Sequence, residues 1–330
     1  MFARNPQYCK EVINLQELEM KLQEAINTSS TIAIAGHVNP DGDAIGACFA
    51  LAAYLDGLGK NVAVLLESCD PKYDIIPGKQ YLYQGNYDKL TPDLFIALDA
   101  STPDRLGKAE AVMHRAKTTA MFDHHMNNTI AADIRFVDPN APSTTLMLYN
   151  HISKHTTIDT EIAAAIYAGL VYDTGGFRHS STTPESLEVA AKLMRTGFNF
   201  TRVYAAILHE KSRDKTRLYA EAIARIAYAE PGIAYTYITL EDKAKYEGEY
   251  PNGVIDYLAT IRGVSTAICA TEQDDHVRVS MRSSRANVGE LAASLGGGGH
   301  KAAAGFSAKG DPLQIINDIL PKLQTELKSQ

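Results

Sequence analysis

Residues 31–59 read TIAIAGHVNPDGDAIGACFALAAYLDGLG, which is a short apolar run, a polar loop and then a helix-like stretch that ends in glycine. Similar apolar runs recur at residues 61–66, 93–99 and 118–123. Short apolar strands that alternate with helices are typical of a parallel, doubly wound sheet that is buried on both faces. This part of the chain is therefore predicted to be an α/β domain with a parallel sheet.

Polar and charged residues follow three of these four strands directly. They are His37, Asp41 and Asp43 after the first strand, Asp99 after the third, and Asp123, His124 and His125 after the fourth. A helical run at residues 165–177 adds Asp173, in front of a glycine pair. In open parallel sheets the ligand crevice lies beyond the carboxyl ends of the strands, so these side chains are expected to gather at one edge.

Two imidazoles and four carboxylates form a candidate set of metal ligands. The set is His37, Asp41, Asp43, Asp99, His124 and Asp173. Carboxylates this close repel one another unless a cation or a proton lies between them. Oxygen and imidazole ligands without thiolates suit Mn, Mg or Fe(II) better than structural zinc. So many ligands favour two ions that share a carboxylate, an arrangement suited to phosphoester hydrolysis. Any one of them alone has an ordinary explanation, such as Asp43 as a helix N-cap.

The chain changes character near residue 232, where shorter strands and helices replace the long helical region before it. Strands are predicted at 233–240, 265–272 and 276–283, helices at 287–295 and 311–327, and a glycine loop at 296–300. We therefore predict a first domain at residues 1–210, a helical linker at 211–231 and a smaller α/β domain with a mixed sheet at 232–330.

The glycine loop GGGGHKAAAG (296–305) suits close approach of the backbone to an anion. It is not a Walker A loop, because no Ser or Thr follows its lysine. Alternation along the preceding strand places Arg278, Ser280 and Arg282 on one face, where they would meet a phosphate or a base together. A flexible turn, and a solvated Arg278, are the alternatives.

Composition and motifs argue against several classes of protein. The net charge of −7 argues against binding of extended nucleic acid, which usually requires a basic surface. The N-terminus lacks the apolar core of a signal peptide, and no apolar stretch has the length of a membrane span, so a cytoplasmic location is expected. The GDAIG segment (42–46) lacks the glycine spacing of dinucleotide-binding dehydrogenases.

Five motifs in this order resemble the DHH phosphoesterases that carry a DHH-associated C-terminal domain. They are GHVNPDGDAIGA, LDAS, FDHH, VYDTGGFRHSSTTPESLEVAAKLM and GGGGHKAAAGF. Their spacing is similar to that of the NrnA-type enzymes, and the resemblance extends from about residue 30 to about residue 310. It implies a manganese-dependent oligoribonuclease that degrades very short RNAs to mononucleotides and also removes the 3′-phosphate from pAp.

The resemblance implies two divalent ions, manganese by expectation and magnesium as the alternative, that share Asp99. The implied ligand sets are His37, Asp41 and Asp99 for one ion, and Asp43, Asp99, His124 and Asp173 for the other. His125 is implied to face the scissile phosphate as a catalytic residue together with Asp99, and the alternative for His125 is to orient His124. Arg105 is a candidate phosphate contact, with a surface salt bridge at least as plausible.

In the second domain the resemblance implies residues that bind the terminal nucleotide. They are Ser280, Arg282, Gly298, Gly299 and His300, with Arg262 as a further phosphate contact. The active site is then expected in the interdomain cleft, which would limit substrates to short single strands and exclude long duplexes and membranes. The alternatives are pApA, pAp alone, single-stranded DNA, polyphosphate or pyrophosphate as substrate, and a catalytically silent nucleotide sensor. The oligomeric state is left open, with a homodimer among the options.

Overall fold

The computed structural model describes residues 6–247 and 253–328, with side chains from residue 15 onward. It divides into two compact units, Met1–Glu210 and Lys211–Gln330. Each unit has its own sheet and its own hydrophobic cores. No helix in the described ranges combines the length and the apolar character that crossing a lipid bilayer needs.

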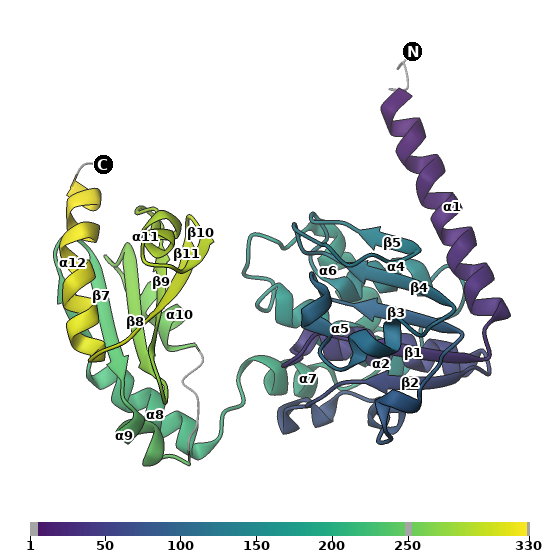
Figure 1. Ribbon diagram of the computed structural model, residues 1–330, viewed down its shortest axis with the longest axis horizontal. Coiled ribbons are helices and arrows are strands. Elements are labelled where there is room, and N and C mark those ends of the chain that lie inside the picture. Colours follow the sequence, from purple (N-terminus) through teal and green to yellow (C-terminus); the bar gives the residue numbers. More distant parts are fainter. Residues whose placement is uncertain (1–5, 248–252, 329–330) are drawn as a thin grey trace. The chain divides into compact units, whose positions relative to one another are not determined.

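The first unit is built on a five-stranded parallel sheet in the order β2-β1-β3-β4-β5 (Figure 1). Its strands are β1 Thr31–Ala35, β2 Asn61–Leu65, β3 Leu94–Leu98, β4 Thr118–Asp123 and β5 Ile134–Val137. The first four are the apolar runs of the sequence, and the predicted parallel α/β fold is confirmed. The chain runs from β1 to β2 at the edge of the sheet and then crosses to β3 on the other side of β1, so a ligand crevice is expected beyond the carboxyl ends of β1 and β3.

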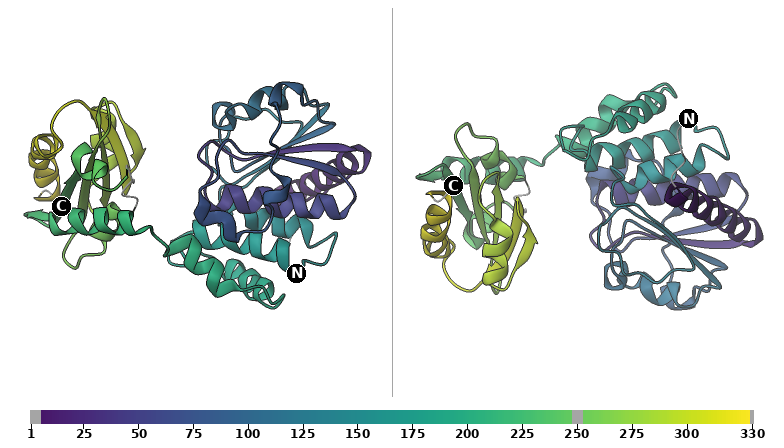
Figure 2. Two further views of the ribbon diagram at one scale, coloured as in Figure 1. Left: turned by 90° about the horizontal axis from the view of Figure 1, so that it is seen from below. Right: turned by 90° about the horizontal axis from the view of Figure 1, so that it is seen from above.

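Helices cover both faces of this sheet, as Figure 2 shows. They are α1 Pro6–Thr28, α2 Gly42–Gly57, α3 Ala109–Met113, α4 Thr144–Ile152, α5 Thr160–Asp173, α6 Pro184–Met194 and α7 Phe200–Leu208, with short 3-10 helices at Pro71–Ile75, Lys79–Tyr81, Tyr87–Lys89 and Pro103–Leu106. On β1, Ile32 and Ile34 pack with α2, α4 and α5, while Ala33 and Ala35 pack with α3. Burial of both faces explains why the strands read as continuous apolar runs.

The second unit contains a six-stranded mixed sheet in the order β10-β11-β9-β8-β7-β6. Its strands are β6 Ala227–Ala229, β7 Ile233–Ile238, β8 Thr266–Glu272, β9 Val277–Ser283, β10 Gly298–His300 and β11 Ala303–Ala308. Only β7 and β8 pair in parallel, so the predicted mixed sheet is confirmed. The glycine segment was predicted as a loop, which is wrong for Gly298–His300, because these residues pair with Ala303–Gly305 of β11 in a tight hairpin.

Five helices complete the second unit. They are α8 Arg213–Ala224, α9 Leu240–Ala244, α10 Val254–Ala259, α11 Val288–Ser294 and α12 Pro312–Lys328. The stretch predicted as a linker contains α8, and this helix buries Leu218 and Ala222 against Ala234 and Ile238 of β7. The helix packs there because its apolar residues form one stripe that the sheet covers. On the opposite face of the sheet, α11 and α12 pack over β8 and β9.

Candidate active site

The six predicted metal ligands lie close together at the carboxyl end of the first sheet and the end of α5. Three ligand atoms within 4.8 Å of one another come from His37, Asp41 and Asp99, and three more from Asp43, His124 and Asp173. These two groups agree with the division into two ion sites that the resemblance implies, except that Asp99 stands only in the first. A third group joins Asp99 and His124 to His125, which was not expected to be a ligand. The roles of the residues as ligands stay a prediction, whereas their proximity is an observation.

Asp41 holds the start of α2 and faces His37 at the same time. Its Oδ1 accepts hydrogen bonds from the backbone N–H groups of Asp43 (2.9 Å) and Ala44 (3.1 Å), so Asp41 is the N-cap and the alternative that Asp43 caps the helix is wrong. Its Oδ2 lies 3.6 Å from His37 Nε2. Since His37 Nδ1 lies 2.8 Å from the carbonyl oxygen of Val38, which can only accept, Nδ1 carries the proton and Nε2 is directed to the carboxylates.

Asp99 lies between the two groups. Its Oδ2 is 3.7 Å from His37 Nε2, and its Oδ1 is 3.5 Å from His124 Nε2. The residue is 2% exposed and has a φ of 55°, in the left-handed region that a non-glycine residue rarely adopts. Strain of this kind persists where the surroundings fix a functional side chain, and it supports the central position expected of a shared ligand.

His124 and Asp173 form the other side of the cluster. His124 Nδ1 lies 3.2 Å from the carbonyl oxygen of Ala141, so its Nε2 faces Asp173 Oδ2 at 3.0 Å. Asp173 Oδ2 is buried, and it pairs with the His124 ring at this distance. A buried carboxylate that faces an imidazole is a donor set suited to a divalent ion.

The carboxylates strongly perturb one another. Burial, and then the charge of Asp173, raise the pKa of Asp43 to about 7. Burial and the charge of Asp43 also raise the pKa of Asp99 well above its usual range. Burial opposes charge on His124, yet the hydrogen bond to Asp173 and the nearby carboxylates raise its pKa to about 10. Protons thus compensate the crowded charges, and divalent ions would take that role where they bind.

The first turn of α4 holds two of these aspartates, which the sequence did not predict. Asp43 accepts hydrogen bonds from the backbone N–H groups of Thr144 (2.6 Å) and Thr145 (3.0 Å), and Thr144 Oγ1 donates to Asp99 Oδ1 (3.1 Å). A helix N-terminus stabilises carboxylates through its free N–H groups and its dipole. Gly169 leaves space for the Asp43 carboxylate, because a Cβ at position 169 would lie 2.5 Å from Asp43 Oδ1.

His125 is held by Asp123, which the sequence placed at the end of the fourth strand, and through it by Asn128, which the sequence did not single out. Its Nδ1 donates to Asp123 Oδ1 (2.6 Å), and Asp123 Oδ2 accepts from Asn128 Nδ2 (2.6 Å). Asp123 is fully buried, whereas the side chain of His125 is 44% exposed. The hydrogen bond that orients His124 goes to Ala141, so the alternative role of His125 as its orienting partner has no hydrogen bond to support it. The hydrogen bond to Asp123 uses Nδ1, so the ring is oriented by that nitrogen.

A pocket of about 480 Å³ lies on the second unit, on the face of β9 that alternates away from its core. Its lining includes Arg278, Ser280, Arg282, Gly298 and Gly299. Arg282 is held in place, because its Nε donates to Asp256 Oδ1 of α10 at 3.1 Å. The predicted alternation along the strand is confirmed, and it brings two guanidinium groups and a hydroxyl to one pocket.

Three residues that were predicted to contact the substrate do not line this pocket. Arg262 and His300 are exposed but do not line this pocket, although both lie in the described part of the chain. In the first unit, the carbonyl oxygen of Arg105 accepts a hydrogen bond from Val38 N–H (2.7 Å), so Arg105 borders the loop that carries His37. None of the ion pairs among the described residues includes Arg105, which removes the support for the salt-bridge alternative.

The fold and the site together define an α/β protein with histidine and carboxylate groups that are able to hold metal ions. The family model described as the DHH family, N-terminal domain, matches residues 31–170, and the model described as the DHHA1 domain matches residues 230–329. The bifunctional oligoribonuclease and PAP phosphatase NrnA of Thermus thermophilus is 32% identical over 302 residues, which cover 90% of each chain. The chain belongs to the DHH family.

Two further proteins are similar over most of the chain. The protein of the same name from Bacillus subtilis is 27% identical over 305 residues, which cover 88% of this chain and 93% of that one. The crystal structure of an exopolyphosphatase-related protein from Bacteroides fragilis aligns with a TM-score of 0.86 at 24% identity, over 95% of this chain and 98% of that one. The structural likeness confirms the fold.

Proposed function

We propose that this protein is a metal-dependent phosphoester hydrolase that degrades very short oligoribonucleotides to mononucleotides and dephosphorylates pAp. The two relatives from Thermus thermophilus and Bacillus subtilis carry both activities in their names. The observation that carries the proposal is the pair of adjacent ligand groups, in which Asp99 of the first group lies 3.5 Å from His124 of the second.

In this proposal, some residues of the first unit bind the metal ions and one contacts the substrate. His37, Asp41 and Asp99 would hold one divalent ion, and Asp43, Asp99, His124 and Asp173 the other. Such ions, manganese by preference, supply an activated hydroxide and neutralise charge on the phosphate. His125 is oriented by Asp123, and its Nε2 would donate a proton or a hydrogen bond to a phosphate oxygen or to the leaving group.

The second unit would recognise the substrate. Arg278, Arg282 and Ser280 offer donors for a terminal phosphate, and the glycine hairpin offers backbone N–H groups without side chains in the way. We propose residues 1–210 as the metal-binding domain and residues 232–330 as the substrate-binding domain, with the helical segment 211–231 between them. A cytoplasmic location, a homodimer, and contacts from Arg262 and His300 stay predictions.

The test compares initial rates of the purified protein with Mn²⁺ on an RNA dimer, an RNA 20-mer, pAp, pApA, polyphosphate and pyrophosphate. The dimer and pAp are expected to be hydrolysed fastest. Asp99→Asn should lower these rates by about 10³-fold, since it removes the shared ligand and several kcal/mol of transition-state stabilisation. Asp104→Asn changes an exposed carboxylate nearby and serves as the matched control, with wild-type rates expected.

Several outcomes would contradict the proposal. Equal slow rates on all substrates that Asp99→Asn leaves unchanged would exclude the assigned site. A clear preference for pApA would instead define a linear dinucleotide phosphodiesterase. Tight binding of nucleotides without turnover would define a sensor, and a preference for pyrophosphate would refute the role given to the second unit.

A further inference from the structure

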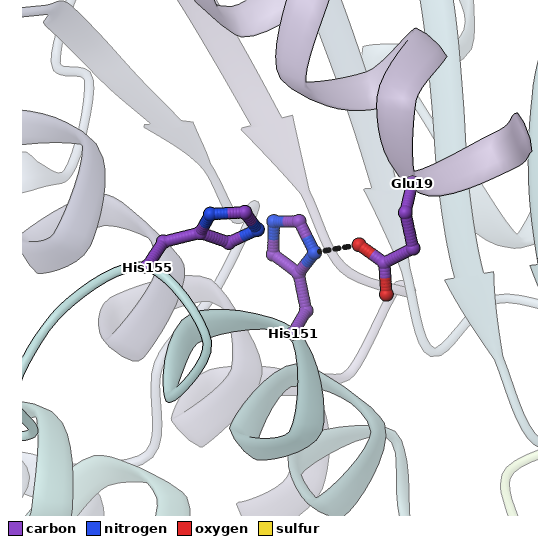
Figure 3. Close-up of side chains that lie close together, drawn as sticks. All are labelled: Glu19, His151 and His155. Atoms are coloured by element: carbon purple, nitrogen blue, oxygen red, sulfur yellow. Dashed lines mark hydrogen bonds and ion pairs between the residues drawn. The ribbon is translucent and has the colours of Figure 1, made fainter. Parts of the chain in front are cut away.

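A second group of imidazole and carboxylate side chains lies between α1 and the end of α4. It consists of Glu19, His151 and His155, which Figure 3 shows close together. None of the three belongs to the ligand groups at the carboxyl end of the sheet. The two histidines stand in HISKH (151–155), four positions apart, so they lie on the same side of the chain as it leaves the helix.

His151 is buried and held in one orientation. It is 1% exposed, and its Nδ1 lies 2.6 Å from Glu19 Oε2. The other oxygen of Glu19 accepts a hydrogen bond from Lys154 Nζ at 2.8 Å, so the carboxylate is fixed from both sides. Because an ionised carboxylate only accepts hydrogen bonds, the proton of the His151 ring lies on Nδ1.

The opposite ring nitrogen of His151 has no partner. Nε2 is buried and makes no hydrogen bond. With the proton on Nδ1, Nε2 presents a lone pair, and a buried polar atom without a partner is energetically unfavourable. The Nε2 atom of His151, on the edge that faces away from Glu19, is therefore able to donate its lone pair to a metal ion.

His155 lies beside that edge. The two imidazole centroids are 5.0 Å apart, with the ring planes at 53°. In Figure 3 the ring of His155 lies on the side of His151 opposite to Glu19. Two nitrogens bound to one tetrahedral zinc ion at 2.0–2.1 Å are separated by roughly 3.3 Å, and rings at this spacing are able to present such a pair. His155 is exposed, which gives an ion a route to the buried Nε2.

We propose that His151 and His155 form a second metal site that binds a borderline divalent ion of the zinc type, with Glu19 orienting His151. A histidine that ligates a metal usually donates its other N–H to a carboxylate, and the Glu19–His151 hydrogen bond provides this arrangement. Water would fill the remaining positions on the exposed side. Two imidazole ligands favour Zn²⁺ over Mg²⁺ or Mn²⁺, in contrast to the carboxylate-rich cluster.

The site ties the N-terminal helix to the rest of the first unit. Glu19 comes from α1, while His151 comes from α4, and an ion on Nε2 favours the tautomer that the Glu19 hydrogen bond needs. Binding to the folded state alone stabilises it by mass action, by about 2.7 kcal/mol at a free ion concentration of 100 Kd. Zn²⁺ is therefore expected to raise the thermal midpoint of the whole chain through this site.

The experiment measures zinc bound per chain after equilibrium dialysis of metal-free protein against Zn²⁺. Wild type is expected to hold one ion more than His155→Ala, which changes an exposed residue and leaves the core intact. Zinc in the carboxylate-rich cluster is common to both proteins and cancels in the difference. His114→Ala, at a histidine that is 72% exposed on another element, is the matched control and should bind as wild type does. Glu19→Gln should weaken the extra ion by about 10–100-fold.

A crystal soaked in Zn²⁺ gives an independent readout at the zinc absorption edge. An anomalous peak between His151 Nε2 and His155 supports the proposal. Equal zinc content in wild type and His155→Ala, or a peak on His155 that does not reach His151, overturns it. Hydrolysis of pAp in the presence of Mn²⁺ should be unchanged in His155→Ala, so this result is independent of the proposed phosphoesterase activity.

Discussion

The hydrogen bonds behind His125 determine what that side chain is able to do. Asn128 donates to Asp123, and Asp123 accepts the Nδ1 proton of His125. The carboxylate keeps this proton on Nδ1, so a neutral ring presents an unprotonated Nε2 and a protonated ring presents a donor there. A protonated ring would donate to a phosphate oxygen or to a leaving group.

We predict that Asp123→Asn lowers kcat for pAp by about 10–100-fold with little change in KM, because the variant replaces the carboxylate that orients the His125 ring. Steady-state kinetics with pAp and Mn²⁺ measure the two parameters. The manganese content per chain, by elemental analysis, should equal that of wild type. Loss of bound manganese in step with kcat would instead mean that Asp123 supports only the loop that carries His124.

At the residue scale, the sequence predicted the side chains that follow strands and missed those that approach from elsewhere. The positions of His37, Asp99 and His124 follow from strand periodicity and from the rule that ligands gather at the carboxyl ends of parallel strands. The contacts from Thr144 and Thr145 do not. Ser143 caps α4, and a serine before a helical run marks a helix start, yet only tertiary packing aims that start at Asp43.

At the element scale, the glycine hairpin β10–β11 shows why a loop was predicted where a strand is found. Glycine has low strand propensity, so a run of four glycines predicts a turn. Pairing with β11, which is itself paired with β9, supplies the hydrogen bonds that propensity does not. Gly299 has a φ of 137°, and a Cβ at this position would lie 2.5 Å from the Cα of Ala304. Gly298 has open space in the same direction.

These neighbouring glycines give a matched pair of variants. Gly299→Ala should destabilise the second unit by about 2 kcal/mol, because a side chain is strained at this φ and collides with β11. Gly298→Ala should leave the free energy of unfolding within about 0.5 kcal/mol of wild type. Urea unfolding followed by circular dichroism measures both. Equal stability of the two variants would show that the hairpin does not depend on the conformation of Gly299.

At the scale of the whole molecule, the two units contribute different chemistry. The first supplies acidic and imidazole groups, whereas the pocket of the second supplies Arg278 and Arg282. The chain carries a net charge of −7, so the favourable contacts with phosphate are local rather than spread over a basic surface. The division into two sheets followed from the sequence, because the strand pattern changes near residue 232. The face of β9 that carries the two arginines also followed from the sequence, whereas the extent of the pocket depends on the packing of β9 against the glycine hairpin.

This division of labour predicts that recognition and hydrolysis are separable by mutation. Arg282→Gln should raise KM for an RNA dimer by about tenfold, the loss of one charge-assisted hydrogen bond, with kcat within about twofold of wild type. Hydrolysis of bis(p-nitrophenyl) phosphate, which lacks a nucleotide end, should be unchanged. Arg217→Gln, at an arginine whose side chain is 68% exposed on α8, is the control for loss of a positive charge.

The dependence of KM on salt concentration gives a second test of the role of Arg282. With two arginines on phosphate, log KM for the dimer should rise with log salt at a slope of about 1.4, and Arg282→Gln should halve that slope. An RNA 20-mer should show the same slope as the dimer, since a chain with a net charge of −7 is not expected to attract phosphates far from the nucleotide end. A steeper slope for the 20-mer would reveal a longer binding track. If Arg282→Gln lowered the activity on the RNA dimer and on bis(p-nitrophenyl) phosphate equally, this arginine would act on the chemistry rather than on recognition.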